Sequence, residues 1–285
     1  MIWEKLIKDN KPLVVTGTIN AYSALLAERA GIKAIYLSGG GVANASYGLP
    51  DLAMTSREDV LEDVRRIRSA SDLPLLVDID TGWGSALAIS RSIKEMISAG
   101  ASGVHIEDQV SEKRCGHRPN KEIVSCEEMV DRIKAAKDAQ TDDNFLLMAR
   151  TDAFAKGGLQ EVIDRSNAFI EAGAGAIFPE AISTLKDYEE ISKNVSKPIL
   201  ANITEFGMTP LFPHNELAKA GVKIVLHPLS AFRAMSKAAE KVYATLASEG
   251  DHEGLLEKMQ TRDELYDVLD YHMYEEKIDK LFEKN

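Results

Sequence analysis

The sequence predicts an α/β fold, a TIM-type (β/α)8 barrel, from three observations. Eight short apolar runs alternate with amphipathic stretches. Polar residues stand at the carboxyl end of nearly every run, where the strands of such a barrel build a site. The chain has 285 residues, and one barrel typically needs about 250. An open doubly wound sheet is the competing architecture, because alternation alone does not decide closure, but eight units in so short a chain favour the barrel.

The candidate strands are buried parallel strands rather than hairpins, because amphipathic stretches separate them. In chain order they read PLVVTGT, AIYLSGG, LPLLVDID, SGVHIEDQ, FLLMART, AIFPEA, PILANIT and KIVLHP.

Helix signals stand between the runs. Residues 56–70 carry apolar side chains at helical spacing, and Ser56 with Asp59 matches a capping box. Ser125 and Glu128 repeat this arrangement before the next amphipathic stretch.

A helical tail follows the eighth run. Residues 259–282 present an apolar face that needs a partner, and another subunit is one candidate. We expect a single barrel domain over residues 1–285, which includes a C-terminal helical extension from about residue 250.

Composition excludes several classes of protein. A hydrophobic content of 45% with 28% charged residues is typical of a soluble globular chain, and no apolar run approaches the length of about 20 residues that a membrane span needs. The first residues carry no export or import signal, so we expect a cytoplasmic protein. Two cysteines cannot build a disulfide framework. A net charge of −11 argues against a nucleic-acid or membrane partner, so cations that attract an anionic substrate must be local.

A metal site is predicted where the third run ends. Asp78 and Asp80 are two residues apart, so on an extended strand both carboxylates share one face. Carboxylates without thiolates or paired histidines suit Mg²⁺, and Mn²⁺ is an alternative. Glu107, at the end of the fourth run, could bind the ion's waters. The competing interpretation is a pair of turn-forming aspartates, while His105 is interpreted as a core residue.

Further polar residues end the later runs, and they predict a site for a carboxylate substrate. A guanidinium at a strand end is well shaped to bind a carboxylate in two-pronged fashion. The four residues are Arg150, Glu180, Asn202 and Thr204.

The second run continues into a glycine-rich turn. Ser38, Gly39 and Gly40 could direct backbone N–H groups at an anion, although an ordinary glycine turn has the same sequence. Tyr36 and Asp51 flank the turn. Tyr36 is the first candidate for a proton acceptor if nearby cations and metal lower its pKa; Asp51 and Glu180 are the alternatives.

A cysteine stands among cations after the fourth run. Cys115 lies between Lys113, Arg114, His117 and Arg118, which we expect to favour its thiolate and proton transfer near neutral pH. No His–Asn partnership of the cysteine-protease kind is visible, so proton transfer is favoured over nucleophilic attack.

Cys126 is the rival thiol, because it stands at a predicted helix start. Its neighbours Glu127 and Glu128 oppose a thiolate, so we interpret Cys126 as structural.

These motifs together resemble the isocitrate lyase and phosphoenolpyruvate mutase superfamily, and within it the methylisocitrate lyases. The resemblance covers nearly the whole chain and is carried by KRCGH at 113–117 with VDIDTGWG, HIEDQ, MARTDA, FPEA and LANITEFG. It implies a Mg²⁺-dependent cleavage of 2-methylisocitrate to pyruvate and succinate, in propionate breakdown by the methylcitrate cycle. It also implies a homotetramer whose terminal helices are exchanged between paired subunits.

The resemblance also implies roles for individual residues. Asp78 and Asp80 match the metal ligands, with Glu107 reaching the ion through water. Cys115 matches the catalytic acid, in a mobile loop. Together with the residues singled out above, the candidate catalytic residues are Cys115, Tyr36, Lys113, His117, Arg150 and Glu180. The substrate-contacting positions are Ser38, Gly39, Gly40, Cys115, Gly116, Arg150, Glu180, Asn202, Ile203, Thr204, Arg233 and Arg262.

Several alternatives stay open. Phe178 and Leu226 favour methylisocitrate, but one methyl group discriminates by only about 1–3 kcal/mol, so isocitrate remains an alternative substrate. Phosphoenolpyruvate mutase and oxaloacetate decarboxylase activities are less favoured, because those enzymes lack the Cys-Gly-His loop. A non-enzymatic dicarboxylate sensor is the last alternative, although sensing needs no thiol acid.

Overall fold

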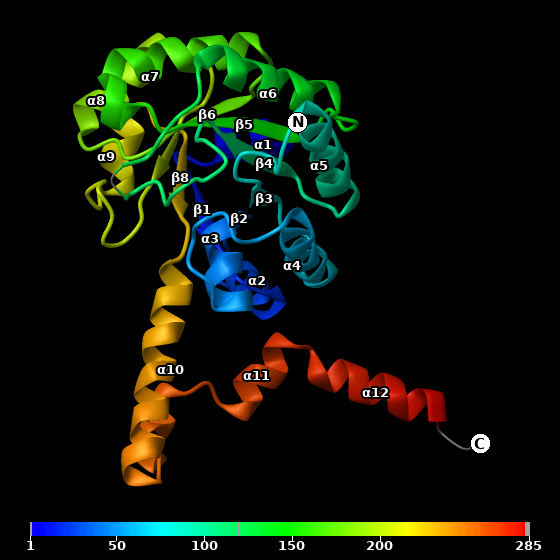
Figure 1. Ribbon diagram of the computed structural model, residues 1–285. Helices are drawn as coiled ribbons and strands as arrows, with labels where there is room; N and C mark the ends of the chain where they lie inside the picture. The colour runs from blue at the N-terminus through cyan, green and yellow to red at the C-terminus, as the bar shows by residue number, and fades with distance from the viewer. Residues whose placement is uncertain (1, 119, 283–285) are drawn as a thin grey trace. The chain divides into compact units, whose positions relative to one another are not determined.

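The computed structural model describes residues 2–118 and 120–282. Eight parallel strands run in the order β6-β5-β4-β3-β2-β1-β8-β7 (Figure 1). Ile177 and Ile199 form a parallel bridge that joins β6 to the start of β7 and closes the sheet. The strands are β1 Leu13–Gly17, β2 Ala34–Leu37, β3 Leu75–Asp78, β4 Gly103–Glu107, β5 Leu146–Thr151, β6 Ala176–Pro179, β7 Leu200–Asn202 and β8 Ile224–His227. All eight predicted strands are confirmed, and the open sheet is excluded.

Helices connect the strands and cover the outside of the barrel (Figure 1). The first half has α1 Ile2–Asp9, α2 Ala21–Arg29, α3 Gly39–Gly41, η1 Val42–Ser46, α4 Arg57–Ala70 and α5 Ala86–Ser98. The second half has α6 Cys126–Asp138, α7 Phe154–Glu171, α8 Leu185–Asn194 and α9 His214–Lys219. The chain ends with α10 Ser230–Glu249, η2 Glu253–Lys258, α11 Arg262–Val268 and α12 Tyr271–Phe282.

The predicted capping residues cap the starts of α4 and α6. Ser56 and Asp59 form a capping box at the start of α4. The Ser125 hydroxyl accepts a hydrogen bond from the Glu128 N–H at the start of α6. Each cap satisfies a backbone donor that the first helical turn leaves without a partner.

Two apolar layers result from this alternation. One cluster lies between strands and helices and includes Ile35, Val77 and Ile106. The other fills the barrel interior and includes Tyr36, Phe178 and Leu226. Trp3 of α1 joins the interior cluster and donates from Nε1 to the Ser102 carbonyl at 2.8 Å. Neighbouring strand residues therefore face opposite layers, as period-two geometry requires.

The chain divides into two compact units, residues 1–232 and 233–285. The second unit, within the described residues, carries several exposed apolar side chains, among them Tyr243, Leu281 and Phe282. The prediction of a single domain with a helical extension from about residue 250 stays a prediction.

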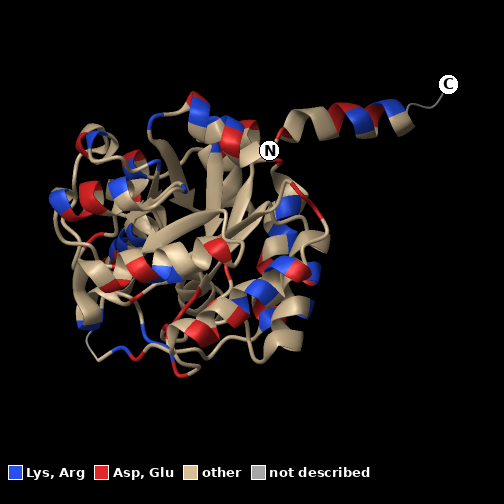
Figure 2. Cartoon of the chain, turned by 90° about the horizontal axis from the view of Figure 1, so that it is seen from above, with Lys and Arg blue, Asp and Glu red and all other residues tan. Residues whose placement is uncertain are grey.

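Both signs of charge are interspersed over the helices, as Figure 2 shows. Within the described part of the chain, no helix is both long and apolar enough to span a membrane.

Candidate active site

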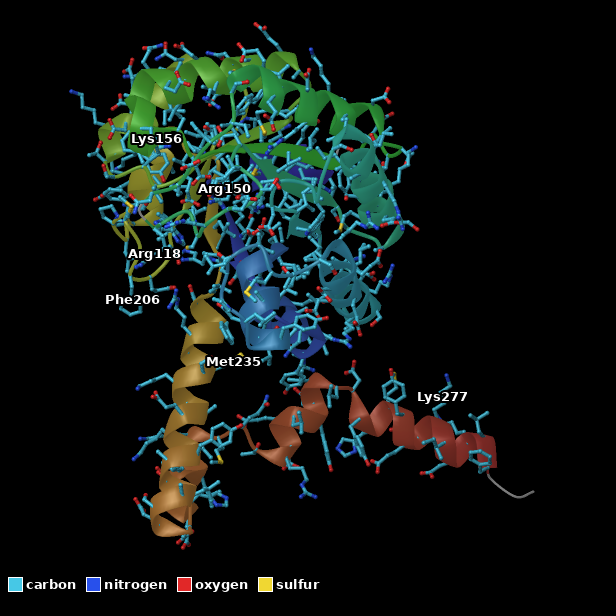
Figure 3. All side chains as sticks on the ribbon, in the orientation of Figure 1. Arg118, Arg150, Lys156, Phe206, Met235 and Lys277 are labelled. Carbon is cyan, nitrogen blue, oxygen red and sulfur yellow. The ribbon has the colours of Figure 1, made fainter. Side chains whose placement is uncertain are left out.

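The carboxyl ends of the strands bring the predicted polar residues of the first unit together. In Figure 3, Arg150 lies below the arch of helices, among the strands, whereas Arg118 and Phe206 lie on loops nearer the edge of the first unit. A cavity of about 840 Å³ lies beside the loop after β4, and its lining includes Asp51, Lys113 and Cys115.

Asp78 and Asp80 hold their carboxylates at the end of β3. Asp78 accepts hydrogen bonds from the backbone N–H groups of Gly39 at 3.1 Å and Asp80 at 3.0 Å. Burial acts to raise the pKa of Asp78, but its interactions with His105, Lys113 and Arg150 outweigh burial and lower this pKa to about 2. Asp80 has a left-handed backbone conformation with φ 47°, so its side chain points in a different direction from that of a residue on a continuing strand.

Glu107 lies fully buried at the end of β4, beside these carboxylates. Neither of its carboxylate oxygens has a hydrogen-bond partner among the described residues, although Oε2 is 3.2 Å from Arg150 Nη1. Burial raises its pKa well above the usual range, against the attraction of Arg150 and Lys113. A buried carboxylate with an unused oxygen fits a water of a hydrated cation.

The donor set fits a divalent metal that keeps part of its water shell. In the described ranges, no three His, Cys, Asp or Glu side chains are arranged to ligate one ion directly. Two carboxylates from Asp78 and Asp80, completed by water and substrate oxygens, are the kind of site that Mg²⁺ uses.

Lys113 supplies the positive charge among these carboxylates. Its ammonium Nζ is 2.7 Å from Asp80 Oδ1 and 2.5 Å from Asp51 Oδ1, and its side chain is 5% exposed. Burial acts to lower the pKa of Lys113, but Asp80, Glu107 and Asp51 outweigh it, so the amine stays charged. Burial raises the pKa of Asp80 to about 6 in spite of this partner.

Arg150 is surrounded by carboxylates on three sides. Its Nε and Nη2 donate to Asp152 at 3.0 and 3.3 Å, Nη1 faces Glu107, and Nη2 is 3.3 Å from Glu180 Oε2. The guanidinium lies over the Phe178 ring, 5.2 Å from its centroid. These contacts fix the plane of the guanidinium, which a two-pronged carboxylate contact requires.

A second group of polar side chains comes from the loop after β4 and from the carboxyl ends of β6 and β7. His117 Nε2 is 3.1 Å from Glu180 Oε1 and 3.3 Å from Asn202 Nδ2, while His117 Nδ1 accepts from the Met208 N–H at 2.9 Å. Burial acts to raise the pKa of Glu180, but Arg150 and His117 outweigh it and hold this pKa well below its usual range. Thr204 lies two residues beyond Asn202, and Ile203 is buried between them.

In the glycine turn, one of the three backbone donors predicted to bind an anion already has a protein acceptor. Ser38 caps the short α3 by accepting from the Gly41 N–H. The Gly39 N–H already donates to Asp78, and a side chain at Gly40 would meet Asp51 Oδ2 at 3.0 Å. The turn therefore packs against the acidic groups, and its glycines permit this close approach.

Tyr36 does not have the lowered pKa that a proton acceptor needs. Burial raises its pKa well above 10, and the negative charge of Asp78 adds to this effect. The hydroxyl lies 2.9 Å from His105 Nε2 and donates to Asp78 Oδ2 at 3.4 Å. Burial lowers the pKa of His105 to about 4, so this ring is neutral and belongs to the barrel interior, as predicted.

The expectation of a thiolate at Cys115 is also wrong. Burial raises the pKa of this thiol, and the His117 backbone hydrogen bond and Arg150 do not compensate. Of the predicted cations, Lys113 is bound to Asp51 and Asp80, while Arg114 and Arg118 are exposed. Cys115 therefore carries its proton near neutral pH. Burial likewise raises the pKa of Cys126, which begins α6.

The segment after Cys115 packs onto the strand ends. A side chain at Gly116 would lie 2.6 Å from Glu180 Oε2 and closer still to Arg150 Nη2. Lys121 Nζ donates to the Gly116 carbonyl at 2.6 Å and pairs with Asp152 Oδ1. Lys121 and Asp152 were not predicted from the sequence. Asp152 could have been found, because it shares a strand face with Arg150, but Lys121 gives no signal of its own.

Two predicted substrate contacts are not part of the group just described. Arg233 lies in α10 and Arg262 begins α11, both in the second unit, so their roles stay predictions.

The match to a protein family decides the assignment. The family model described as phosphoenolpyruvate phosphomutase matches residues 3–247. The chain belongs to the isocitrate lyase and phosphoenolpyruvate mutase superfamily.

Individual members of this superfamily are similar over almost their whole length. The chain is 59% identical to a 2-methylisocitrate lyase of Vibrio cholerae serotype O1, with 97% of this chain and 92% of the relative covered. It is 59% identical to a 2-methylisocitrate lyase of Escherichia coli K12, with 98% and 95% covered. The recognition made from the sequence is therefore confirmed, since these relatives carry the name of a carbon–carbon lyase.

Solved members share the fold. A phosphonopyruvate hydrolase in complex with oxalate and Mg²⁺ superposes with a TM-score of 0.87 at 27% identity, covering 99% of this chain and 98% of the other. The TIM-type fold is confirmed, and a divalent metal is used in this superfamily.

Proposed function

We propose that this protein cleaves the C2–C3 bond of 2-methylisocitrate to release pyruvate and succinate, with Mg²⁺ or Mn²⁺ as cofactor. The observation that carries this proposal is the packing of Cys115 and Gly116, here called the Cys115 segment, in which Gly116 lies against Arg150 and Glu180. A protonated thiol thus stands beside a cationic group at the barrel mouth. The names of the similar lyases support the choice of substrate.

Asp78 and Asp80 would hold the metal, and Glu107 would bind one of its waters. When bound, the ion supplies Lewis-acid stabilisation of the oxygens that become the carboxylate and ketone of pyruvate. Mg²⁺ is favoured because the donors are carboxylates and water.

The chain's own groups provide the proton acceptor. Tyr36 is unsuited because burial raises its pKa, and Glu180 is a weak base because its pKa is lowered. Asp51 lines the same cavity as Cys115 and is paired with Lys113. Because its carboxylate lines the cavity of Cys115, and not because of its pairing with Lys113, we assign Asp51 as the base that accepts the proton of the C2 hydroxyl.

Cys115 and Arg150 act on the succinate half. Cleavage leaves an electron pair on carbon, delocalised into a carboxylate, and Arg150 stabilises the resulting dianion where charge develops. The Cys115 thiol then donates its proton to that carbon. His117 and Asn202 bind the Glu180 carboxylate and hold it beside the proposed substrate site. The three side chains together make this side of the site polar.

Phe178 and Leu226 belong to the buried cluster that fills the barrel. The resemblance places the additional methyl group of 2-methylisocitrate near these two side chains, although both are fully buried. Because one methyl group contributes only about 1–3 kcal/mol, we expect slow cleavage of isocitrate as well.

The biological setting follows from the same proposal. We assign the enzyme to the methylcitrate cycle of propionate catabolism, in the cytoplasm, as a homotetramer. The exposed apolar side chains of α12, such as Ile278 and Leu281, support an assembly in which another subunit covers them.

The test is pyruvate release from 2-methylisocitrate and glyoxylate release from isocitrate, each with Mg²⁺ and with chelator. Metal-dependent pyruvate formation that far exceeds glyoxylate formation is the expected result. Release of neither keto acid would overturn the proposal and would favour the mutase, decarboxylase or sensor alternatives.

A further inference from the structure

A buried lysine joins the Cys115 segment to the residue that orients Arg150. The Lys121 side chain is 4% exposed, and its ammonium donates to the Gly116 carbonyl at 2.6 Å. The same ammonium pairs with Asp152 Oδ1. Because a buried charge is costly unless it is paired and hydrogen-bonded, the two partners together explain why the lysine remains inside.

The two partners of Lys121, Gly116 and Asp152, lie next to residues of the proposed reaction. Gly116 directly follows Cys115, and it packs against Arg150 and Glu180. The Asp152 carboxylate accepts hydrogen bonds from Arg150 Nε at 3.0 Å and Arg150 Nη2 at 3.3 Å, so it sets the orientation of the guanidinium. The Asp152 N–H donates to Asp108 Oδ1 at 2.9 Å, which anchors Asp152 to the residue that follows the neighbouring strand β4.

We infer that Lys121 is a positioning residue: it ties the backbone beside Cys115 to Asp152 and thereby fixes the thiol relative to Arg150. This inference rests on the proposed function, because the thiol and the guanidinium act on the same half of the substrate. Lys121 itself does not contact the reacting atoms. It holds the proton donor at the distance and angle that proton transfer requires.

The main variant is Lys121→Met, which removes the ammonium and keeps most of the side-chain volume. The matched control is Lys134→Met, whose side chain is 63% exposed on α6. Each protein is treated with iodoacetamide, and the alkylation rates of Cys115 and Cys126 are measured separately by peptide mass spectrometry. We expect Cys115 to react about tenfold faster in Lys121→Met, the change that loss of one charged hydrogen bond produces. Cys126 should keep its parental rate, whereas a general loss of structure would accelerate both thiols.

Turnover gives the second readout. In Lys121→Met we expect kcat to fall by about 100-fold, the cost of a misplacement of about 1 Å, with a much smaller change in KM. The solvent deuterium isotope effect on kcat should rise, because protonation by a displaced thiol becomes the slow step. Lys121→Arg should recover part of kcat, since it restores the charge.

The outcomes separate this inference from the proposed function. Alkylation does not need turnover, so a parent protein that fails to release pyruvate overturns only the proposed function. Parental Cys115 alkylation and parental kcat in Lys121→Met would overturn the inference. If Lys121→Met does not fold, Asp152→Asn removes the same ion pair, and an unchanged Cys115 rate in that variant would overturn the inference equally.

Discussion

A methyl group added at Gly116 should separate the Cys115 segment from the strand ends. An added Cβ would lie 2.6 Å from Glu180 Oε2, whereas ordinary contact begins at 3.4 Å, so the two must separate by about 0.8 Å. Arg150 cannot yield, because Asp152, Glu107 and Glu180 surround it. The loop has to move instead, and a displacement of about 1 Å costs about 100-fold in rate.

We therefore predict that Gly116→Ala lowers kcat by about 100-fold while thermal stability stays close to that of the parent. Stability should hold because Gly116 belongs to neither apolar cluster of the described residues. Pyruvate release coupled to lactate dehydrogenase measures kcat and KM, and thermal denaturation measures stability.

Gly254→Ala is the matched control, because an added Cβ at exposed Gly254 meets no atom within 4 Å. Its kcat should equal the parental value. Parental kcat in Gly116→Ala would refute the reasoning, since the loop would then not pack against Arg150 and Glu180 during turnover.

Four further predictions concern the acid, the metal and pH. Cys115→Ser should lower kcat by about 100-fold to 10,000-fold, the contribution of general acid catalysis, while substrate binding in calorimetry is retained; parental turnover would reject the proton-donor role. Asp78→Ala should weaken Mn²⁺ binding, followed by electron paramagnetic resonance, by more than the roughly 100-fold that loss of an outer partner costs, and unchanged binding would place the metal elsewhere. Lys113→Met should strengthen Mn²⁺ binding by about tenfold, because an ammonium 2.7 Å from Asp80 no longer competes with the ion, although kcat should fall. Alkylation of Cys115 should keep rising above pH 9, because burial raises the pKa of its thiol, and a plateau below pH 8 would contradict that direction.

The sequence predicted the barrel because each strand is short, apolar and followed by a helix signal. It also predicted which side chains meet, since strand ends of a parallel barrel converge on one face. Asp78, Glu107, Arg150, Glu180 and Asn202 illustrate this, because each lies at the end of its strand or next to it.

Properties that depend on burial and on distant partners could not be predicted. The pKa of Tyr36 depends on the desolvation of its hydroxyl inside the barrel, which no local pattern reveals. The Gly39 N–H looked available for an anion, but Asp78, far away in sequence, already accepts it. Lys121 was missed for the same reason, since its partner Asp152 belongs to another strand unit.

The spacing of the cations around Cys115 suggests that they stabilise a thiolate, but in the structure Lys113 and Lys121 pair with carboxylates. Lys113 neutralises Asp51 and Asp80, and Lys121 neutralises Asp152, so neither charge is left to stabilise a thiolate. Burial then decides the state of the sulfur and keeps it protonated. A protonated thiol is the state that a general acid needs, because a thiolate would have no proton to donate to the carbanion. Cations in this segment therefore pair with Asp51, Asp80 and Asp152 and hold the loop in place, and the protonated state of Cys115 follows from its partial burial.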